Sequence, residues 1–233
     1  RFDELLLPES VCEYLIRASL QSNPPHLLIS GPTGIGKTVA WRLVARQVLG
    51  PSWQATTHII QAKDLAKTAG AMKNFEDFLR PEGSSSKDTL AGRTSLDAYY
   101  SNLSSAVAGD VAPAGIESFE LQEEDRVPIS RIIVIEDADF LGKARQSYLR
   151  RMVEESSRSA RFIFTARTPS RIIDALRSRT QMIRFPAIPR KGIEGRLNEI
   201  VSEENLSPDR GIIGDIAHIS NGNLRKAIFL TQL

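Results

Sequence analysis

Hydrophobic positions follow two alternating periods along most of this sequence. Short apolar runs that predict buried strands occur at residues 26–30, 58–62, 131–137, 161–166 and 181–185. Hydrophobic residues at helical spacing occur at residues 8–20, 37–50, 143–156 and 170–179. Strands that alternate with helices in this way predict an α/β fold, in which helices cover both faces of a parallel sheet.

The same spacing predicts which side chains of the helices point to the core. The expected inward residues are Val11, Leu15, Ile16 and Leu20 in 8–20, Val39, Leu43, Val44 and Val48 in 37–50, and Tyr148, Leu149, Met152 and Val153 in 143–156. Cys12 lies beside the first of these faces, so we expect a buried structural thiol rather than a reactive one. As the single cysteine it excludes an internal disulfide and is typical of a reducing compartment.

The last part of the sequence has only the helical period. After residues 186–191, which contain two prolines, hydrophobic positions predict helices at 193–205, 209–219 and 221–232. Ser207 and Pro208 are expected to cap and start the middle helix. This unit of about 45 residues is too small to be stable alone, so it should pack on the α/β part of the chain.

Residues 63–130 give a weaker signal than the rest of the chain. Helices are possible at 64–79 and 95–108, but stretches rich in Gly, Ser, Pro and charged residues separate and follow them. We therefore expect an insertion with poorly defined boundaries. The predicted organisation is an α/β domain at 1–187, which contains this insertion, and a small helical domain at 188–233.

Composition limits the class of protein without identifying a partner. The chain of 233 residues is 41% hydrophobic and 25% charged, and no apolar run approaches the roughly 20 residues of a membrane-spanning helix. A net charge of +2 is too small to indicate a nucleic acid. Three histidines, His26, His58 and His218, lie too far apart to predict a zinc site. Because the first residue is Arg1 rather than Met, we expect a fragment of a longer protein.

A glycine-rich segment between a predicted strand and a predicted helix is the main candidate for a binding site. It matches G-x-x-x-x-G-K-[ST] with Gly31, Pro32, Thr33, Gly34, Ile35, Gly36, Lys37 and Thr38. Its glycines let backbone N–H groups face phosphate oxygens, and the following helix start favours negative charge. We expect Lys37 to contact the β- and γ-phosphates of ATP and Thr38 to bind Mg²⁺. A glycine turn with an incidental lysine is the alternative.

An acidic pair ends the apolar run that begins at residue 131. The usual order at such a strand end is Asp followed by Glu, but here Glu136 precedes Asp137. We expect Glu136 to help hold Mg²⁺ through water and Asp137 to act on the attacking water. Because an Asp side chain is shorter than Glu by about 1.5 Å, slow hydrolysis is predicted. Solvated carboxylates at a strand end are the alternative interpretation.

Several segments together resemble a known family. The segments FDELLLPESV, GPTGIGKT, IIVIEDADFLGKARQSYLRRMVEES, RFIFTARTPSRIIDALRSRTQMIRF and NGNLRKAI are similar to the successive boxes of replication factor C small subunits. These are AAA+ ATPases that load sliding clamps onto DNA, and the pattern is most similar to the divergent second small subunit of some archaeal clamp loaders. The resemblance lapses across 63–130. It implies a P-loop AAA+ module with a helical lid, ATP and Mg²⁺ as ligands, and a C-terminal collar domain outside this sequence.

The resemblance also implies roles for three arginines. Arg179, in RSRT, matches the arginine of the family's Ser-Arg-Cys box, which reaches the ATP of the adjacent subunit, although Thr180 replaces the Cys. Arg225, in GNLRKA, matches the lid arginine that contacts nucleotide. For both, a solvated or helix-terminal arginine is the alternative. Arg167 stands where the family usually has an Asn that positions water, and an arginine cannot accept a hydrogen bond from water.

Partners follow from the same resemblance. It implies a hetero-oligomer with other large and small clamp-loader subunits, the sliding clamp, and primer–template DNA. Lys143 and Arg145 match a helix start that follows the DNA backbone, although a solvated basic helix end is an equal alternative. The implied location is the cytoplasm of an archaeon or the nucleus of a eukaryote.

Three functions are therefore compared. The first is a clamp-loader subunit that binds ATP, hydrolyses it slowly or not at all, and supplies Arg179 to a neighbour. The second is a fully active DNA-dependent ATPase, such as a branch-migration motor or remodeller, which Asp137 and Arg167 argue against. The third is a purely structural nucleotide-binding scaffold, for which Arg179→Ala would leave the ATPase rate of the complex unchanged.

Overall fold

A five-stranded parallel sheet forms the centre of the protein. The computed structural model describes residues 1–65, 71–79, 112–115, 127–155, 159–209 and 211–232. The strands are β1 (Leu27–Ser30), β2 (Thr57–Gln61), β3 (Arg131–Glu136), β4 (Ala160–Ala166) and β5 (Gln181–Arg184). They lie in the order β2-β3-β4-β1-β5, and every neighbouring pair is parallel. The predicted α/β fold and all five predicted strands are confirmed.

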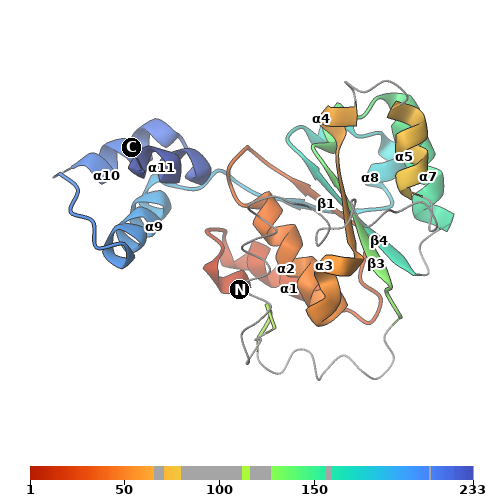
Figure 1. The fold of residues 1–233 in the computed structure, drawn as a ribbon, viewed down its shortest axis with the longest axis horizontal. Coiled ribbons are helices and arrows are strands. Elements are labelled where there is room, and N and C mark those ends of the chain that lie inside the picture. Colours follow the sequence, from red (N-terminus) through yellow and green to blue (C-terminus); the bar gives the residue numbers. More distant parts are fainter. Residues whose placement is uncertain (66–70, 80–111, 116–126, 156–158, 210, 233) are drawn as a thin grey trace.

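Helices cover both faces of this sheet (Figure 1). One face carries α1 (Glu9–Leu20), α2 (Lys37–Leu49) and α3 (Trp53–Thr56), and the other carries α4 (Ala62–Leu65), α5 (Ala71–Leu79), α7 (Lys143–Glu155) and α8 (Asp174–Arg177). Short 3-10 turns are η1 (Phe2–Glu4), η2 (Gly50–Ser52), η4 (Ala138–Phe140) and η5 (Pro169–Arg171). The sheet separates two hydrophobic clusters, one against α1 and α2 and one against α5 and α7. Because both faces are covered, all seven residues of β4 are buried.

Three C-terminal helices form a separate layer beside the N-terminal residues. They are α9 (Arg190–Glu203), α10 (Ile212–Ser220) and α11 (Leu224–Thr231). Ile193 and Leu197 of α9 are fully buried and belong to the same hydrophobic cluster as Phe2 and α2. The guanidinium of Arg196 donates a hydrogen bond to the carbonyl of Glu4 at 2.8 Å. The helical unit therefore packs on the α/β part, as its small size predicted.

The start of helix α10 differs from the prediction. Helix α10 begins at Ile212 rather than after Ser207 and Pro208, and residues 206–209 have no regular structure. The residue that precedes the helix is Gly211, with a φ of 93° that favours glycine over other residues. The chain therefore turns at the glycine, and the Ser-Pro pair lies in the connection from α9.

The predicted inward faces are partly wrong. On α2, Val39 is 51% exposed, whereas Trp41 is 1% exposed and belongs to the core. On α7, Gln146 is buried and Tyr148 only half-buried, because the Gln146 amide bridges α7 to the chain around Arg171. Cys12 is half-buried rather than buried.

The helices expected at 64–79, 95–108 and 170–179 have different outcomes. The expected helix 64–79 is represented by α4 and α5, whereas the expected helix 95–108 lies outside the described residues. The expected helix 170–179 is divided into η5 and α8. In the part of the chain that the structure describes, no helix is long and apolar enough to cross a membrane.

Candidate functional site

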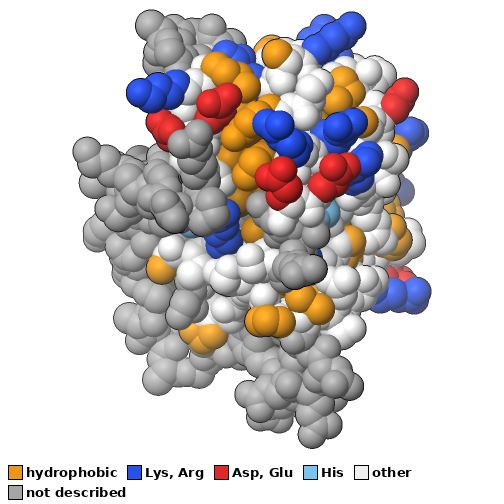
Figure 2. All heavy atoms as spheres, turned by 90° about the vertical axis from the view of Figure 1, so that its right-hand side faces the viewer, with side chains coloured by type: hydrophobic (Ala, Val, Ile, Leu, Met, Phe, Trp, Pro, Cys, Tyr) orange, Lys and Arg blue, Asp and Glu red, His pale blue; other side chains and the backbone are white. Residues whose placement is uncertain are grey.

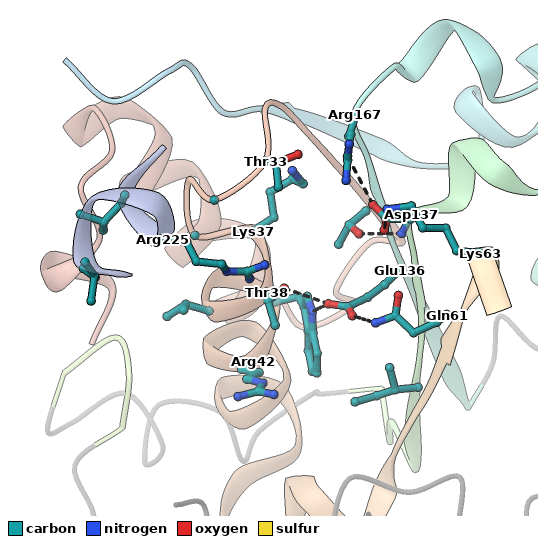
Figure 3. Close-up of a pocket in the computed structure, with 18 residues that line it drawn as sticks. Thr33, Lys37, Thr38, Arg42, Gln61, Lys63, Glu136, Asp137, Arg167 and Arg225 are labelled. Atoms are coloured by element: carbon teal, nitrogen blue, oxygen red, sulfur yellow. Dashed lines mark hydrogen bonds and ion pairs between the residues drawn. The ribbon is translucent and has the colours of Figure 1, made fainter. Parts of the chain in front are cut away.

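The candidate site lies at the edge of the sheet where the parallel strands end. β1 leads into the glycine-rich segment, β3 ends at Glu136, and β4 ends one residue before Arg167. These three strand ends border a cavity of about 640 Å³ that the lid helix α11 also lines (Figure 3). The lining residues are Thr33, Gly34, Gly36, Lys37, Thr38, Val39, Trp41, Arg42, Ile59, Gln61, Lys63, Glu136, Asp137, Thr165, Arg167, Leu224, Arg225 and Ile228. Ligands commonly bind at this edge of α/β sheets.

The glycine-rich segment turns directly into helix α2, as predicted. Gly34 and Gly36 have φ angles of 77° and 98°, which other residues adopt only with strain. Lys37 is the first residue of α2, and its Nζ donates to the carbonyls of Gly31 at 2.7 Å and Pro32 at 2.5 Å. The N-terminus of this 13-residue helix therefore faces the cavity, where its dipole favours an anion.

The side chains of the glycine-rich segment divide between the core and the cavity. The Ile35 side chain is 3% exposed and packs in the hydrophobic core, whereas Thr33 lines the cavity.

Burial is the main cause of a lowered pKa for Lys37. The Asp137 carboxylate opposes this effect, and the Arg167 guanidinium adds to it.

Glu136 accepts hydrogen bonds from three neutral side chains. Its Oε1 accepts from the Thr38 hydroxyl at 2.9 Å and from the indole N–H of Trp41 at 2.9 Å. Its Oε2 accepts from the amide of Gln61. Gln61 comes beside Glu136 because β2 and β3 pair in a register that places these two residues opposite each other. The predicted proximity of Thr38 and Glu136 is thus observed, and Trp41 and Gln61 join them.

Asp137 points away from this group and pairs with two cations (Figure 3). Its Oδ2 lies 2.6 Å from Nζ of Lys63, and its Oδ1 lies 3.9 Å from Nε of Arg167. The residue has a φ of 52°, and its N–H donates to the Thr165 hydroxyl at 3.1 Å. This turn of the backbone separates the two adjacent carboxylates, so that they belong to different hydrogen-bonding groups.

The Arg167 backbone is fixed by another acidic residue. The carboxylate of Asp139 is 6% exposed and accepts the backbone N–H groups of Arg167 and Thr168, both at 3.3 Å. The ion pair with Asp137 thus comes from an arginine whose main chain is held in place. The carboxylate that pairs with the Arg167 side chain is that of Asp137.

The lid contacts the glycine-rich segment through main-chain atoms. The backbone N–H of Arg225 donates to the carbonyl of Gly34 at 3.3 Å, and the Arg225 side chain lines the cavity. Asn223 caps helix α11 by accepting the N–H of Lys226 at 3.0 Å. A Cβ atom at Gly34 would lie 1.7 Å from Oδ1 of Asn223. A glycine is therefore required at residue 34 both for its φ and for the lid.

Three other predicted residues lie outside the cavity. Arg179 is on the surface, where its Nε donates to Glu154 at 2.6 Å and its Nη1 to the carbonyl of Ala175 at 2.7 Å. Lys143 is exposed at the start of α7, and Arg145 is half-buried on the same helix. In the space-filling view of the α5 and α7 side, basic and acidic side chains are interspersed (Figure 2). The charges visible there do not form a surface of one sign.

Among the residues that sequence reasoning missed, Trp41, Gln61 and Lys63 line the cavity and Asn223 lies against Gly34. A signal existed for Gln61 and Lys63, because they lie at the end of a predicted strand, at the same edge as the glycine-rich segment. Trp41 had no signal, since its role depends on the distance between α2 and β3.

Comparisons with known proteins agree with this geometry. The sequence model of the ATPase family associated with various cellular activities (AAA) matches residues 27–187, and that of the RCF1/5-like AAA+ ATPase lid domain matches residues 195–232. Replication factor C subunit 2 of Phaeosphaeria nodorum is 28% identical over 230 residues, covering 98% of this chain and 52% of the relative. The replication factor C small subunit of Methanoculleus marisnigri is 27% identical, covering 100% of this chain and 59% of the relative.

The relatives do not favour one type of small subunit. Small subunits 1 and 2 of replication factor C from Pyrobaculum aerophilum are 29% and 27% identical to this chain. The predicted similarity to replication factor C small subunits is thus confirmed, and the finer similarity to a second small subunit stays a prediction. The chain spans between half and three-fifths of the length of these relatives.

Solved structures show the same fold. A variant of RuvB from Thermotoga maritima superposes with a TM-score of 0.60 at 17% identity, covering 98% of this chain and 65% of that one. The RuvB Holliday junction branch migration motor from the same organism superposes with a TM-score of 0.56 at 16% identity, with the same coverage of both chains. At such identities the likeness concerns the arrangement of helices and strands alone.

Proposed function

This chain belongs to the ATPase family associated with various cellular activities, and we propose that it is the ATP-binding part of a sliding-clamp loader subunit in DNA replication. Its similarity to replication factor C small subunits over nearly its whole length supports the proposal. In this proposal residues 1–187 form the nucleotide-binding domain and residues 188–233 the lid. A clamp loader works where DNA is replicated, in the cytoplasm of archaea or the nucleus of eukaryotes.

ATP binding is supported by the glycine-rich segment and the lid. Backbone N–H groups at the start of α2 face the cavity, and Lys37 lies beside them with its side chain already bonded to the same loop. Arg225 lines the cavity from helix α11 of the lid. A nucleotide in this cavity would thus contact both parts of the chain, so that its presence favours one position of the lid.

Slow or absent hydrolysis at this site is supported chiefly by one observation, the ion pairs of Asp137. A carboxylate that takes a proton from water must come within hydrogen-bonding distance of that water. Asp137 is instead engaged by Lys63 at 2.6 Å and by Arg167 at 3.9 Å. Both carboxylate oxygens of Asp137 thus face cations of the same chain rather than the position of an attacking water. Its short side chain adds to this effect.

Donation of Arg179 to a neighbouring subunit is supported by its position. The side chain is 36% exposed, lies away from the cavity of its own chain, and is oriented by Glu154 and the Ala175 carbonyl. An arginine that stabilises the transferring phosphoryl group from a neighbour can contribute about 10³ to 10⁵ in rate. We propose that it serves an adjacent subunit in a hetero-oligomer, which also binds the clamp and primer–template DNA, with Lys143 and Arg145 near the phosphates.

The test is single-turnover ATP hydrolysis by the assembled complex with clamp and primed DNA. We expect Arg179→Ala to lower the rate by about 10³ or more, because it removes the transferred guanidinium. Lys37→Ala is expected to change the rate less than about twofold, because this site contributes little turnover. Arg177→Ala is the matched control, since Arg177 is the last residue of α8, two residues before Arg179, and pairs with Asp174 instead.

Other outcomes would identify the other two functions. If Lys37→Ala lowers the rate as strongly as Arg179→Ala, the site hydrolyses its own ATP and the chain is a competent motor subunit. If Arg179→Ala leaves the rate unchanged while ATP still binds, the chain is a structural scaffold.

A further inference from the structure

The carboxylates of the cavity are occupied by other groups of this chain, which bears on the metal ion. Membership of this ATPase family implies a divalent cation with the nucleotide. Mg²⁺ is usually held by one or two carboxylates together with phosphate oxygens and water. We propose that nucleotide binding at this site does not depend on Mg²⁺, because side-chain cations neutralise the phosphates instead. This inference rests on the proposed binding of ATP.

Glu136 has little acceptor capacity left for a metal-bound water. A carboxylate offers about four lone-pair sites on its two oxygens. Thr38 and Trp41 occupy Oε1, and Gln61 occupies Oε2. The Thr38 bond leaves that hydroxyl oxygen free to accept, but both sites of Oε1 and one of the two sites of Oε2 are filled, so a single acceptor site remains for a metal-bound water. Trp41 is 1% exposed, so water cannot replace Glu136 as the acceptor of its indole N–H.

Asp137 does not replace Glu136 as a metal ligand. Its two oxygens face Lys63 and Arg167, and its own N–H is tied to Thr165. A divalent cation at Asp137 would have to displace Lys63 and Arg167 or bind close to them, where their positive charges repel it. In the part of the chain that the structure describes, no group of three or more His, Cys, Asp or Glu is placed to hold a metal ion. Because donors occupy most of Glu136 and cations face Asp137, the two carboxylates of the cavity do not fit a Mg²⁺ ion.

Positive side chains supply the charge that a metal would contribute. Five cations line the cavity, namely Lys37, Arg42, Lys63, Arg167 and Arg225, against the two carboxylates of Glu136 and Asp137. Figure 3 shows Lys37, Arg167 and Arg225 projecting from three different elements around the same space. Guanidinium groups bind phosphate through paired hydrogen bonds and stay charged at all physiological pH values. A nucleoside triphosphate is thus matched by charges that belong to the protein.

The experiment is calorimetric titration of the full-length protein with ATP, once in excess Mg²⁺ and once in EDTA at the same ionic strength. We expect the two dissociation constants to agree within about threefold, which corresponds to well under 1 kcal/mol. Binding that weakens by more than about tenfold in EDTA would overturn the inference. If ATP binds in neither buffer, the proposed function fails instead.

Two variants test the cause assigned to Glu136. Gln61→Leu and Trp41→Phe each remove one hydrogen-bond donor to Glu136 and so free an acceptor site for a metal-bound water. Because a hydrogen bond to a charged group is strong, we expect the ratio of the ATP affinity in Mg²⁺ to the ATP affinity in EDTA to rise about tenfold in each variant. Trp53→Phe is the matched control, because Trp53 does not line the cavity. Since Trp41 is buried, its variant is used only if its thermal unfolding is cooperative. If the Gln61→Leu protein is folded and its ratio of ATP affinities in Mg²⁺ and EDTA equals that of the wild type, the role given to Glu136 is wrong.

Discussion

Nζ of Lys63 lies 2.6 Å from Oδ2 of Asp137, across the ends of two neighbouring strands. Arg167 approaches the other oxygen of the same carboxylate from the end of β4. One acidic residue is thus held between cations from two separate strand ends. If Asp137 does not act as a general base because it is paired in this way, removing the two cations should produce ATP hydrolysis at this site.

The double variant Lys63→Met and Arg167→Asn should raise hydrolysis at this site. Removing both cations frees Asp137 and restores an amide able to orient water, and a general base contributes about 10² to 10⁴ in rate. Because Asp137 is short, we expect only about a tenfold increase. The measurement is single-turnover hydrolysis at saturating ATP, in a complex whose other subunits carry Ala for their phosphate-loop lysines. Lys143→Met is the control, and an unchanged rate in the double variant would show that side-chain length alone limits Asp137.

Gly34→Ala should destabilise the protein more than Gly36→Ala. Both glycines have positive φ angles, so each substitution carries a strain of about 1–2 kcal/mol. A Cβ at Gly34 also collides with Asn223, whereas a Cβ at Gly36 meets nothing within 4 Å. We expect at least about 1 kcal/mol of additional loss in the free energy of unfolding, measured by urea denaturation.

The same pair of residues offers a rescue experiment. Asn223→Gly removes the colliding side chain. The loss of the Asn cap on α11 lowers the free energy of unfolding by only roughly a few tenths of a kcal/mol. Added to Gly34→Ala, it should bring the stability back to about that of Gly36→Ala. If it does not, the additional loss arises within the loop and not from the lid.

His26 should make the protein less stable in mild acid. Its Nδ1 accepts the N–H of Phe162 at 3.0 Å, and burial, with a smaller effect of Arg161, lowers its pKa from 6.5 to about 4. The unfolded chain therefore binds a proton below pH 6.5 that the folded protein refuses. The stabilisation is complete above pH 6.5 and is lost as the pH falls toward 4, by about 2 kcal/mol between pH 7 and pH 5.

The check is the free energy of unfolding as a function of pH. His26→Asn keeps an acceptor for Phe162 but does not titrate, so its stability should change less over this range. His218→Asn is the control, because His218 is exposed on α10. A pH profile that is the same in His26→Asn and the wild type would assign the acid sensitivity to other groups.

Cys12 should react slowly with alkylating reagents at neutral pH. Burial raises the pKa of its thiol, and the carboxylates of Asp3 and Glu9 raise it further. Since the thiolate is the nucleophile, the alkylation rate with iodoacetamide at pH 7.5 should be lower than that of a free cysteine and should rise with pH. Glu9→Gln removes one of the charges and should speed the reaction. A rate equal to that of free cysteine would contradict this prediction.

The sequence predicted those parts of the fold that depend on local patterns. The five strands were found because strands buried on both faces are continuous apolar runs, and the phosphate loop because its glycines and Lys37 are consecutive. The order of Glu136 and Asp137 was also visible, and with it the expectation of slow hydrolysis.

The partners of these residues could not be predicted, because they depend on the order and register of strands. Gln61 lies beside Glu136 only because β2 pairs with β3, and Lys63 reaches Asp137 for the same reason. The start of α10 was misplaced because a local Ser-Pro signal competed with Gly211 in the same connection. Trp41 was overlooked on α2 because Val39 suggested a helix face rotated from the true one.

The hydrogen bond from the backbone of Arg225 to the carbonyl of Gly34 belongs to no side chain. Substitution at position 225 by any residue except proline retains the donor, so the link between lid and loop can persist while the sequence diverges. The arginine side chain can then change over evolutionary time without separating the two domains. A substitution at residue 225 can therefore change the affinity for nucleotide while the hydrogen bond between lid and loop is kept.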